Sequence, residues 1–413
     1  MLQSKRTLSA DAVHVLPRVL LMSVWAGCAG TVYGCASPAD DSVDSRIALQ
    51  TSVWIRCADE NQRCTFAGTR RVRYGVDDRT VIKSFTDGVA CSNDQFGDPA
   101  FGSGKYCDYE NVTTDPAPSP PDGSYPVGDQ GTNEIRLRPT TETAPASDIG
   151  AFRTVCEYSH MSKDDPIVFP GQPGASHLHT FFGNTLTNAF STADSLRNTG
   201  NSTCRGGTAN RTAYWIPSLL DLNGIPIAPT EAVFYYKSGY NIPNVSSRIS
   251  LIPSGLRMVA GDPKATSANH DSAGSWGCTN VYRGHNPAII DCDIGDSIQL
   301  DVNFPQCWNG RDLDSPDHRS HMAYPDGQCP ATHPVILPEI SLHIRWSRTP
   351  TTKFYELRLA SDMYDTRVGG GYSAHADWFE GWRDDVKESF VRNCVNASRD
   401  CHAHLTGDGR EMY

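Results

Sequence analysis

Fourteen cysteines constrain this 413-residue chain more than any other residue type. No two of them have the C-x-x-C spacing that is typical of zinc ribbons and of thioredoxin-like redox sites. A cysteine-rich globular chain without that spacing is typical of an oxidising compartment, where cysteines pair as disulfides. Cys28 and Cys35 lie in the amino-terminal segment, so twelve cysteines remain. Twelve is an even number, and it predicts six disulfides.

The amino terminus has the pattern of a secretory signal over residues 1–35. Basic residues precede a short apolar run at residues 19–27, which is too short for a comfortable membrane span. No later segment approaches 18 apolar residues, so we expect an extracellular protein with no transmembrane span in the mature chain. The sequence V-Y-G-C ending at Cys35 resembles a lipoprotein cleavage box, which would make Cys35 a lipid anchor. The alternative is ordinary cleavage near Ala36, without an anchor.

The remaining chain divides into a small module, a linker and a main domain. Residues 46–110 predict a cysteine-rich β module with two disulfides, for which three pairings are open. Residues 111–147 are rich in Pro, Thr and Ser and predict a linker. Residues 148–405 predict the main domain, with eight cysteines. We expect those eight to pair with their nearest neighbours in sequence, because each pair then closes one loop: Cys156, Cys204, Cys278, Cys292, Cys307, Cys329, Cys394 and Cys401.

Short strand-like runs separated by Gly, Pro and Asn turns dominate the main domain. They predict a mainly β fold, a β-sandwich or jelly roll with few helices. One helix is predicted over residues 378–393, where apolar residues follow a helical period. The strand-like runs lie at residues 53–55, 71–74, 213–216, 232–236, 297–302 and 340–346.

Charge and missing motifs exclude several classes of protein. The formal net charge of -11 argues against a nucleic-acid binder, since binding to phosphates needs an excess of Lys and Arg. The chain lacks the G-x-S-x-G, H-E-x-x-H, P-loop and Rossmann glycine patterns. Their absence argues against common serine hydrolases, zinc proteases, kinases and dehydrogenases.

Histidines carry the main functional signal. In His177-Leu178-His179 the two imidazoles are two residues apart, so an extended strand places both on one face. They could then converge on one metal ion or on one substrate group. The alternative is a pair of structural histidines that are hydrogen-bonded in a polar pocket.

A second cluster is the stretch D-H-R-S-H at residues 317–321. An aspartate can orient an imidazole for acid–base catalysis, and arginine binds carboxylate or hydroxyl groups. His318, Arg319 and His321 are therefore candidate catalytic residues. Asp317, with Asp312 and Asp314 just upstream, could instead hold calcium through carboxylate oxygens, although an EF-hand glycine is missing. The remaining alternative is a charged, solvated loop.

A third cluster begins with His375 and Asp377, which are also two residues apart. Trp378 and Trp382 follow, and tryptophan faces stack on sugar rings, although we expect these two to be a buried aromatic staple. Two further candidates for catalysis are Asp165, which precedes an apolar run, and Tyr214.

The main domain resembles a family of secreted fungal and bacterial proteins known only as a domain of unknown function. In fungi that domain often lies beside cell-wall or carbohydrate-binding modules. The resemblance implies a secreted, disulfide-linked, β-rich domain, and it brings no established activity. The family pattern often has Asp where this chain has Asn309. The matching stretches lie at residues 152–161, 164–174, 177–184, 213–217, 304–310, 317–321, 329–334 and 375–378.

The amino-terminal block, with Trp54, Cys57 and the stretches at residues 64–75 and 91–107, resembles a small module of secreted bacterial glycan-active proteins. That resemblance implies a carbohydrate-binding or cell-surface module.

Two functional hypotheses follow. The first is an enzyme that degrades an extracellular polysaccharide or cell-wall glycan. As a lyase it would use Arg319 or a cation to neutralise a uronate, one of the histidines as base, and Tyr214 or a histidine as acid. As a hydrolase it would use two carboxylates, drawn from Asp165, Asp317 and Asp377. The second is a non-catalytic glycan- or metal-binding surface protein, in which His177 and His179 hold a divalent cation, calcium or a transition metal. The sequence leaves the oligomeric state open.

Overall fold

The structure, a computed structural model, describes residues 51–66, 69–77, 79–113, 125–269, 273–279, 285–348, 354–364 and 370–413. The expected signal segment, with Cys28 and Cys35, lies outside these ranges. Across them, no helix has the length and apolar character needed to cross a membrane.

The amino-terminal module is an antiparallel four-stranded sheet with its own core. The strands lie in the order β1-β6-β3-β4, beside a two-stranded β2-β5 pair. Val72, Tyr74 and Phe96 are buried in the core together with the cysteines. Disulfides join Cys57 to Cys64 and Cys91 to Cys107. The elements are β1 (Thr51–Asp59), β2 (Arg63–Cys64), β3 (Thr69–Val76), β4 (Arg79–Thr86), β5 (Val89–Ala90), α1 (Asn93–Phe96) and β6 (Tyr106–Thr113).

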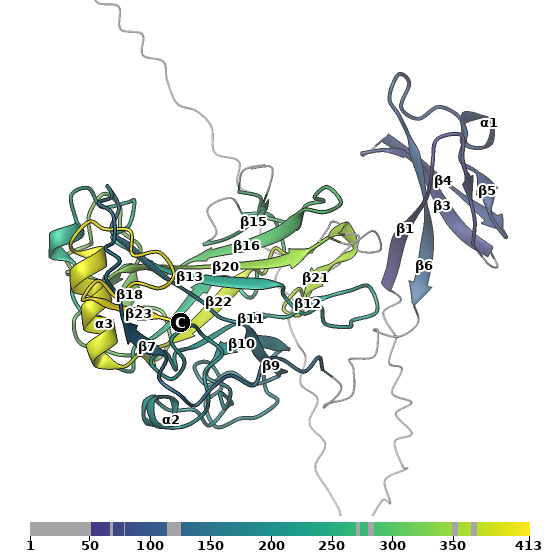
Figure 1. The fold of residues 1–413 in the computed structure, drawn as a ribbon. Coiled ribbons are helices and arrows are strands. Elements are labelled where there is room, and N and C mark those ends of the chain that lie inside the picture. Colours follow the sequence, from purple (N-terminus) through teal and green to yellow (C-terminus); the bar gives the residue numbers. More distant parts are fainter. Residues whose placement is uncertain are drawn as a thin grey trace, which may run out of the picture. The chain divides into compact units, whose positions relative to one another are not determined.

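The main domain is built on two antiparallel sheets of five strands each (Figure 1). The first, called the β10 sheet, has the order β14 (Arg257–Gly261), β22 (His375–Phe379), β11 (Ala213–Pro217), β10 (His179–Gly183) and β9 (Tyr158–Ser162). The second, called the β16 sheet, has the order β15 (Gly274–Cys278), β16 (Ser297–Asn303), β20 (Glu339–Ser347), β13 (Glu231–Lys237) and β8 (Ala151–Val155).

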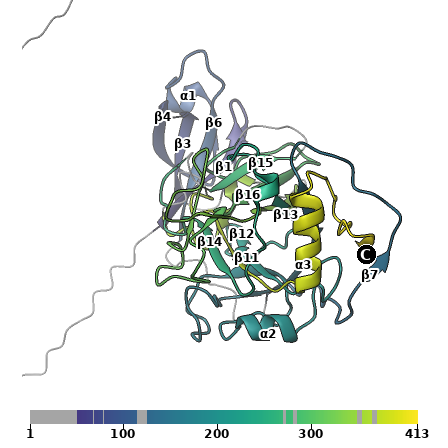
Figure 2. The same cartoon turned by 90° about the vertical axis from the view of Figure 1, so that its left-hand side faces the viewer.

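Helix α3 (Asp384–Phe390) lies at one end of the domain in Figure 1 and stands upright in Figure 2. It is one of several smaller elements of the main domain. These elements are β7 (Leu137–Pro139), α2 (Ala193–Asn198), β12 (Leu219–Leu220), η1 (Ser246–Arg248), β17 (Cys307–Trp308), β18 (Met322–Ala323), β19 (Val335–Ile336), η2 (Phe354–Glu356), β21 (Arg358–Leu359), α3 (Asp384–Phe390), the π-helical turn η4 (Val391–Val395) and β23 (Arg410–Met412).

Aromatic side chains join the two sheets into a sandwich. Tyr214 of the β10 sheet stacks on Phe234 of the β16 sheet, with ring centroids 3.9 Å apart. The Tyr236 hydroxyl accepts hydrogen bonds from the indole nitrogens of Trp378 and Trp382, at 3.2 and 2.9 Å. Buried aromatic groups of this kind stabilise a core through both contact area and paired polar ends. The mainly β, sandwich-like fold predicted from the sequence is confirmed.

The two sheets differ on the faces that point away from this core. Strand β16 alternates between buried and partly exposed residues, as expected of a sheet with one solvated face. Strands β10, β11 and β22 are buried at every position. Other parts of the chain must therefore cover the outer face of these three central strands, and polar side chains on that part of the face are removed from water.

Two predicted elements differ from the structure. The helix predicted over residues 378–393 begins only at Asp384, because Trp378 belongs to strand β22 and pairs with Tyr214 and Met258. The predicted linker over residues 111–147 is wrong in its second half: β7 pairs with β23 near the carboxyl terminus. Residues 125–147 therefore belong to the main domain.

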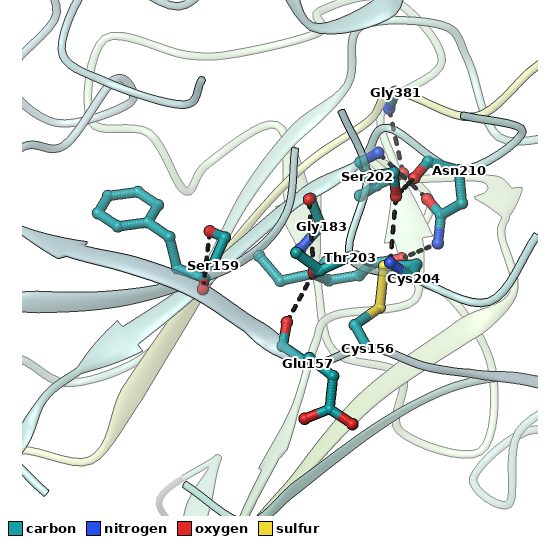
Figure 3. Close-up of a disulfide and its surroundings, with 12 residues drawn as sticks. Cys156, Glu157, Ser159, Gly183, Ser202, Thr203, Cys204, Asn210 and Gly381 are labelled. Carbon is teal, nitrogen blue, oxygen red and sulfur yellow. Dashed lines mark hydrogen bonds between the residues drawn. A yellow bond between two sulfur atoms is a disulfide. The ribbon is translucent and has the colours of Figure 1, made fainter. Parts of the chain in front are cut away.

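All six disulfides described here join nearest neighbours in sequence, as predicted for the main domain. Figure 3 shows the Cys156–Cys204 bond, which closes a segment of 48 residues. Polar contacts tie the two ends of this segment together, since the Thr203 hydroxyl donates to the Glu157 carbonyl at 2.6 Å. The closed segment contains Asp165, His177 and His179.

Removal of this disulfide should destabilise the domain more than removal of a disulfide that closes a short loop. Loop-closure entropy predicts a loss of about 4 kcal/mol for Cys156→Ser/Cys204→Ser and about 2 kcal/mol for Cys394→Ser/Cys401→Ser, whose cysteines are only 7 residues apart. Urea unfolding followed by tryptophan fluorescence measures both losses. Equal losses, or the reverse order, would show that strain or local packing outweighs chain entropy.

Candidate functional site

Two histidines stand at the starts of strands on the covered outer face of the β10 sheet. His179 opens β10 opposite Pro217, and His375 opens β22 opposite Gly261. Asp377 lies two residues after His375 and therefore on the same face. It is flanked by Trp215 and Val259 on the neighbouring strands. The three central strands thus present three polar side chains at one end of a face that also carries the apolar cluster of Phe181, Trp215 and Phe379.

His177 reaches the same place from the loop that leads into β10. Its ring centroid lies 4.2 Å from that of His179 and 5.0 Å from that of His375. His179 and His375 are 5.9 Å apart by the same measure. The predicted convergence of the H-x-H pair is therefore present, and a third histidine from a distant part of the chain joins it. His179 and His375 are buried, whereas His177 is half-buried.

Hydrogen bonds determine which ring nitrogens carry protons. Nδ1 of His179 lies 2.9 Å from the Asp164 carbonyl, and Nδ1 of His375 lies 2.8 Å from the Ser373 carbonyl. A carbonyl oxygen only accepts, so each Nδ1 donates and each Nε2 carries the lone pair. Backbone carbonyls hold metal-binding histidines in the same way.

Two carboxyl groups lie beside the histidines. Asp165, Asp377 and His179 each offer an atom that lies within 4.8 Å of the others. One oxygen of Asp165 accepts hydrogen bonds from the amides of Ile167 and Val168, both at 2.9 Å. Both oxygens of Asp377 are buried without a hydrogen-bond partner among the described residues.

Burial controls the pKa values of all five groups. It lowers the pKa of His179 and of His375 to about 4, and it holds the pKa of His177 well below its usual range, with the other two histidines adding to the effect. Burial also raises the pKa of Asp165. Burial, and then the neighbouring Asp165, raises the pKa of Asp377 well above its usual range. The histidines are therefore neutral near pH 7, which is the state that binds metals.

The three histidines fit a transition-metal ion. Their ligand atoms lie within 4.8 Å of one another, whereas two nitrogens bound to one zinc ion at about 2.1 Å can be at most about 4.2 Å apart. Small ring movements would close that difference. Nε2 of His177 and Nε2 of His179 are buried without a partner in the described part of the chain. Nitrogen donors suit zinc and similar ions, whereas calcium prefers oxygen.

The predicted D-H-R-S-H loop borders this site. It is anchored to strand β14, because His321 Nε2 lies 2.7 Å from the Arg257 carbonyl and Asp314 accepts from the Arg257 guanidinium at 3.1 Å. Strand β14 pairs with β22, which carries His375 and Asp377. The charge of Arg319 reaches both of these residues and opposes the rise in the pKa of Asp377.

Some predicted residues do not reach the cluster. Tyr214 lies on the core face of the β10 sheet, where its hydroxyl pairs with that of Tyr236 at 2.7 Å. Both ring nitrogens of His321 are hydrogen-bonded within the fold. His318 pairs with Asp314 at 3.0 Å. The structure therefore uses Asp314, one of the possible calcium ligands, to bind His318 and Arg257.

Other residues at the site were not singled out by sequence reasoning. Trp215 lies opposite Asp377, and its indole nitrogen is buried without a partner among the described residues. Asp164 and Ser373 act through their backbone carbonyls, which any residue could supply. Trp215 could be recognised as a neighbour of Asp377 only from the pairing register of strands β11 and β22, which the sequence alone does not predict.

Fold and site together define a disulfide-linked β-sandwich protein with a histidine-rich candidate metal centre. Its many disulfides are consistent with an extracellular protein. A family model described as "Domain of unknown function (DUF1996)" matches residues 165–382, and the chain belongs to this family. The match includes all five residues of the cluster. Searches of curated proteins and of solved structures each found no match.

Histidine titration tests the burial of this cluster. His179 and His375 should remain neutral down to a pH of about 4, because burial disfavours the charged imidazolium. NMR of the chelator-treated protein with labelled histidine ring carbons measures the midpoints, and His179→Gln and His375→Gln variants assign the signals. Midpoints near 6.5 would mean that water reaches both rings.

Proposed function

We propose that this chain is a secreted, metal-dependent enzyme that cleaves extracellular polysaccharides. The observation that carries the proposal is the convergence of His177, His179 and His375, whose ligand atoms lie within 4.8 Å of one another on a covered sheet face. Three histidines with an open fourth position are typical of catalytic rather than structural metal sites. A transition metal bound there would act as a Lewis acid and would lower the pKa of bound water.

The chain's own residues complete the site. Asp165 and Asp377 are the candidate groups for proton transfer, because each offers an oxygen within 4.8 Å of the atom that His179 offers. An inverting hydrolase needs about 6.5–9.5 Å between its carboxyl groups to admit a water molecule. The close pair here therefore favours an elimination or a retaining hydrolysis.

Features around the site support a polysaccharide substrate. Phe190 is 66% exposed, and its segment is hydrogen-bonded to the loop that carries Asp165, through Gly171 and Ala189 at 2.7 Å. An exposed aromatic ring on a segment joined to the Asp165 loop suits the apolar face of a sugar. The six disulfides support function outside the cell, and a lipid anchor at Cys35 remains part of the sequence-based expectation.

Metal-binding measurements test whether His177, His179 and His375 form a metal site. Purified protein stripped with a chelator should bind one zinc ion per chain, and His177→Ala/His179→Ala should weaken binding on the order of 100-fold or more, since even loss of an indirect contact costs about 10- to 100-fold. Titration calorimetry and elemental analysis measure this effect. His343→Ala is the control, because this histidine lies on strand β20 of the other sheet, pairs with Asp301 at 2.6 Å, and belongs to no group of possible metal ligands among the described residues. Equal affinity in the double variant and in His343→Ala would contradict the metal centre.

Activity tests the enzyme. Incubation with neutral glucans, pectins, alginates and glucuronans should release product only with metal present. Ultraviolet absorbance would identify an unsaturated lyase product, and new reducing ends without absorbance would identify hydrolysis. Metal binding without product from any polymer would contradict catalysis and would favour a metal-binding surface protein.

A further inference from the structure

Arg319 differs from every other polar side chain of its loop. Asp317 accepts four hydrogen bonds, from Ser315 Oγ, the amides of Arg319 and Ser320, and Ser320 Oγ, at 2.7 to 3.1 Å. These bonds fold the loop on itself. The Arg319 side chain is exposed and makes no hydrogen bond or ion pair with the described residues.

The loop is also held rigidly from outside. His318 adopts a positive φ of 57°, a conformation that costs energy for a residue other than glycine. Its ring is held by Asp314, which also binds Arg257 of strand β14. His333 Nε2 lies 2.9 Å from the Ser320 carbonyl on the far side. The surroundings therefore fix the backbone at Arg319 and leave its guanidinium free.

The position of the Arg319 guanidinium relative to the histidine cluster suggests what it binds. The loop is anchored on Arg257, which pairs with Phe379, two residues beyond Asp377 on strand β22. The charge of Arg319 also acts on His375 and Asp377: it adds to the burial that lowers the pKa of His375 and opposes the burial that raises the pKa of Asp377. Arg311, a nearby exposed arginine, is instead paired with Asp312 at 2.7 Å. An arginine that is held in place but unpaired beside a covered polar site is suited to bind an anionic ligand group through two parallel hydrogen bonds.

We propose that Arg319 binds an anionic group of the substrate beside the His177–His179–His375 site, so that the substrate is an acidic polysaccharide. This inference rests on the proposed function for the identity of the polymer, although the binding role of Arg319 can be tested without catalysis. A uronate carboxylate and a sulfate ester share the required chemistry, because both offer oxygens to a guanidinium. His318, Asp317 and His321 act as positioning residues that hold the loop.

The experiment measures binding of metal-loaded protein to matched pairs of polymers. One pair is polyglucuronate and the same polymer with its carboxyl groups reduced to neutral glucose. The other pair is dextran sulfate and dextran. Wild-type protein should bind one charged polymer at least 10-fold more tightly than its neutral partner. The pair that shows the difference identifies carboxylate or sulfate as the anion.

Variants assign that preference to Arg319. Arg319→Gln should lose at least 10-fold in affinity for the charged polymer and nothing for the neutral one. Arg319→Lys should fall in between, because it keeps the charge and loses the two-pronged geometry. Arg311→Gln should match the wild type, and metal affinity should be unchanged in all three variants.

Each outcome has a distinct meaning. Equal binding of charged and neutral polymers, or an Arg319→Gln variant that binds as tightly as the wild type, would overturn the inference. Loss of the charged-polymer preference in Arg311→Gln as well would overturn it too, since general surface charge would then be responsible. Failure to cleave any polymer would refute the proposed function and would leave the binding result for Arg319 intact.

Discussion

The rest of the main domain depends on one constraint. Polar side chains on the outer face of the three central strands of the β10 sheet are shielded from water, so they need partners within the fold or in a ligand. Strands β10, β11 and β22 are buried on both faces, yet they carry His179, His375 and Asp377 on the outer one. A buried polar group without a partner costs roughly 1–3 kcal/mol. Both carboxylate oxygens of Asp377 and the Nε2 atoms of His177 and His179 are in that position among the described residues. Such a cluster lowers the stability of the fold, and a metal ion held by the three histidines would supply a partner for the Nε2 atoms of His177 and His179.

The loops over this face have to be held firmly, because they supply the other groups of the site. The Cys156–Cys204 disulfide closes the segment that carries Asp165 and His177. The D-H-R-S-H loop is held instead by Asp317 and by its contacts with Arg257. Covalent and hydrogen-bonded restraints thus act on opposite sides of the same site. Preorganisation of this kind limits the reorganisation that binding or catalysis would require.

Local patterns in the sequence predicted those features of the fold and the site that depend on residues close together in the chain. The two-residue spacing of His177 and His179 predicted their shared face, and the order of the cysteines along the chain predicted the four disulfides of the main domain. The joining of His375 to that pair depends on the strand order β22-β11-β10, which no local pattern contains. The predicted helix began too early because the buried strand residue Trp378 falls on the helical period of Trp382 and Val386. Similarly, D-H-R-S-H gave no sign that its other four side chains hold the loop while Arg319 makes no hydrogen bond or ion pair with the described residues.

Arg319 is exposed, whereas His179 and His375 are buried, and this difference in exposure has a physical reason. A guanidinium among the imidazole nitrogens would repel a divalent ion, and that repulsion would be strong where burial lowers the local dielectric. At the exposed edge of the site the same charge is screened by water, so it can coexist with a metal. An anionic sugar between the two cations would then attract both, and its charge would help to hold them together. A neutral sugar would gain no such attraction, so an exposed cation whose charge acts on His375 favours an acidic substrate.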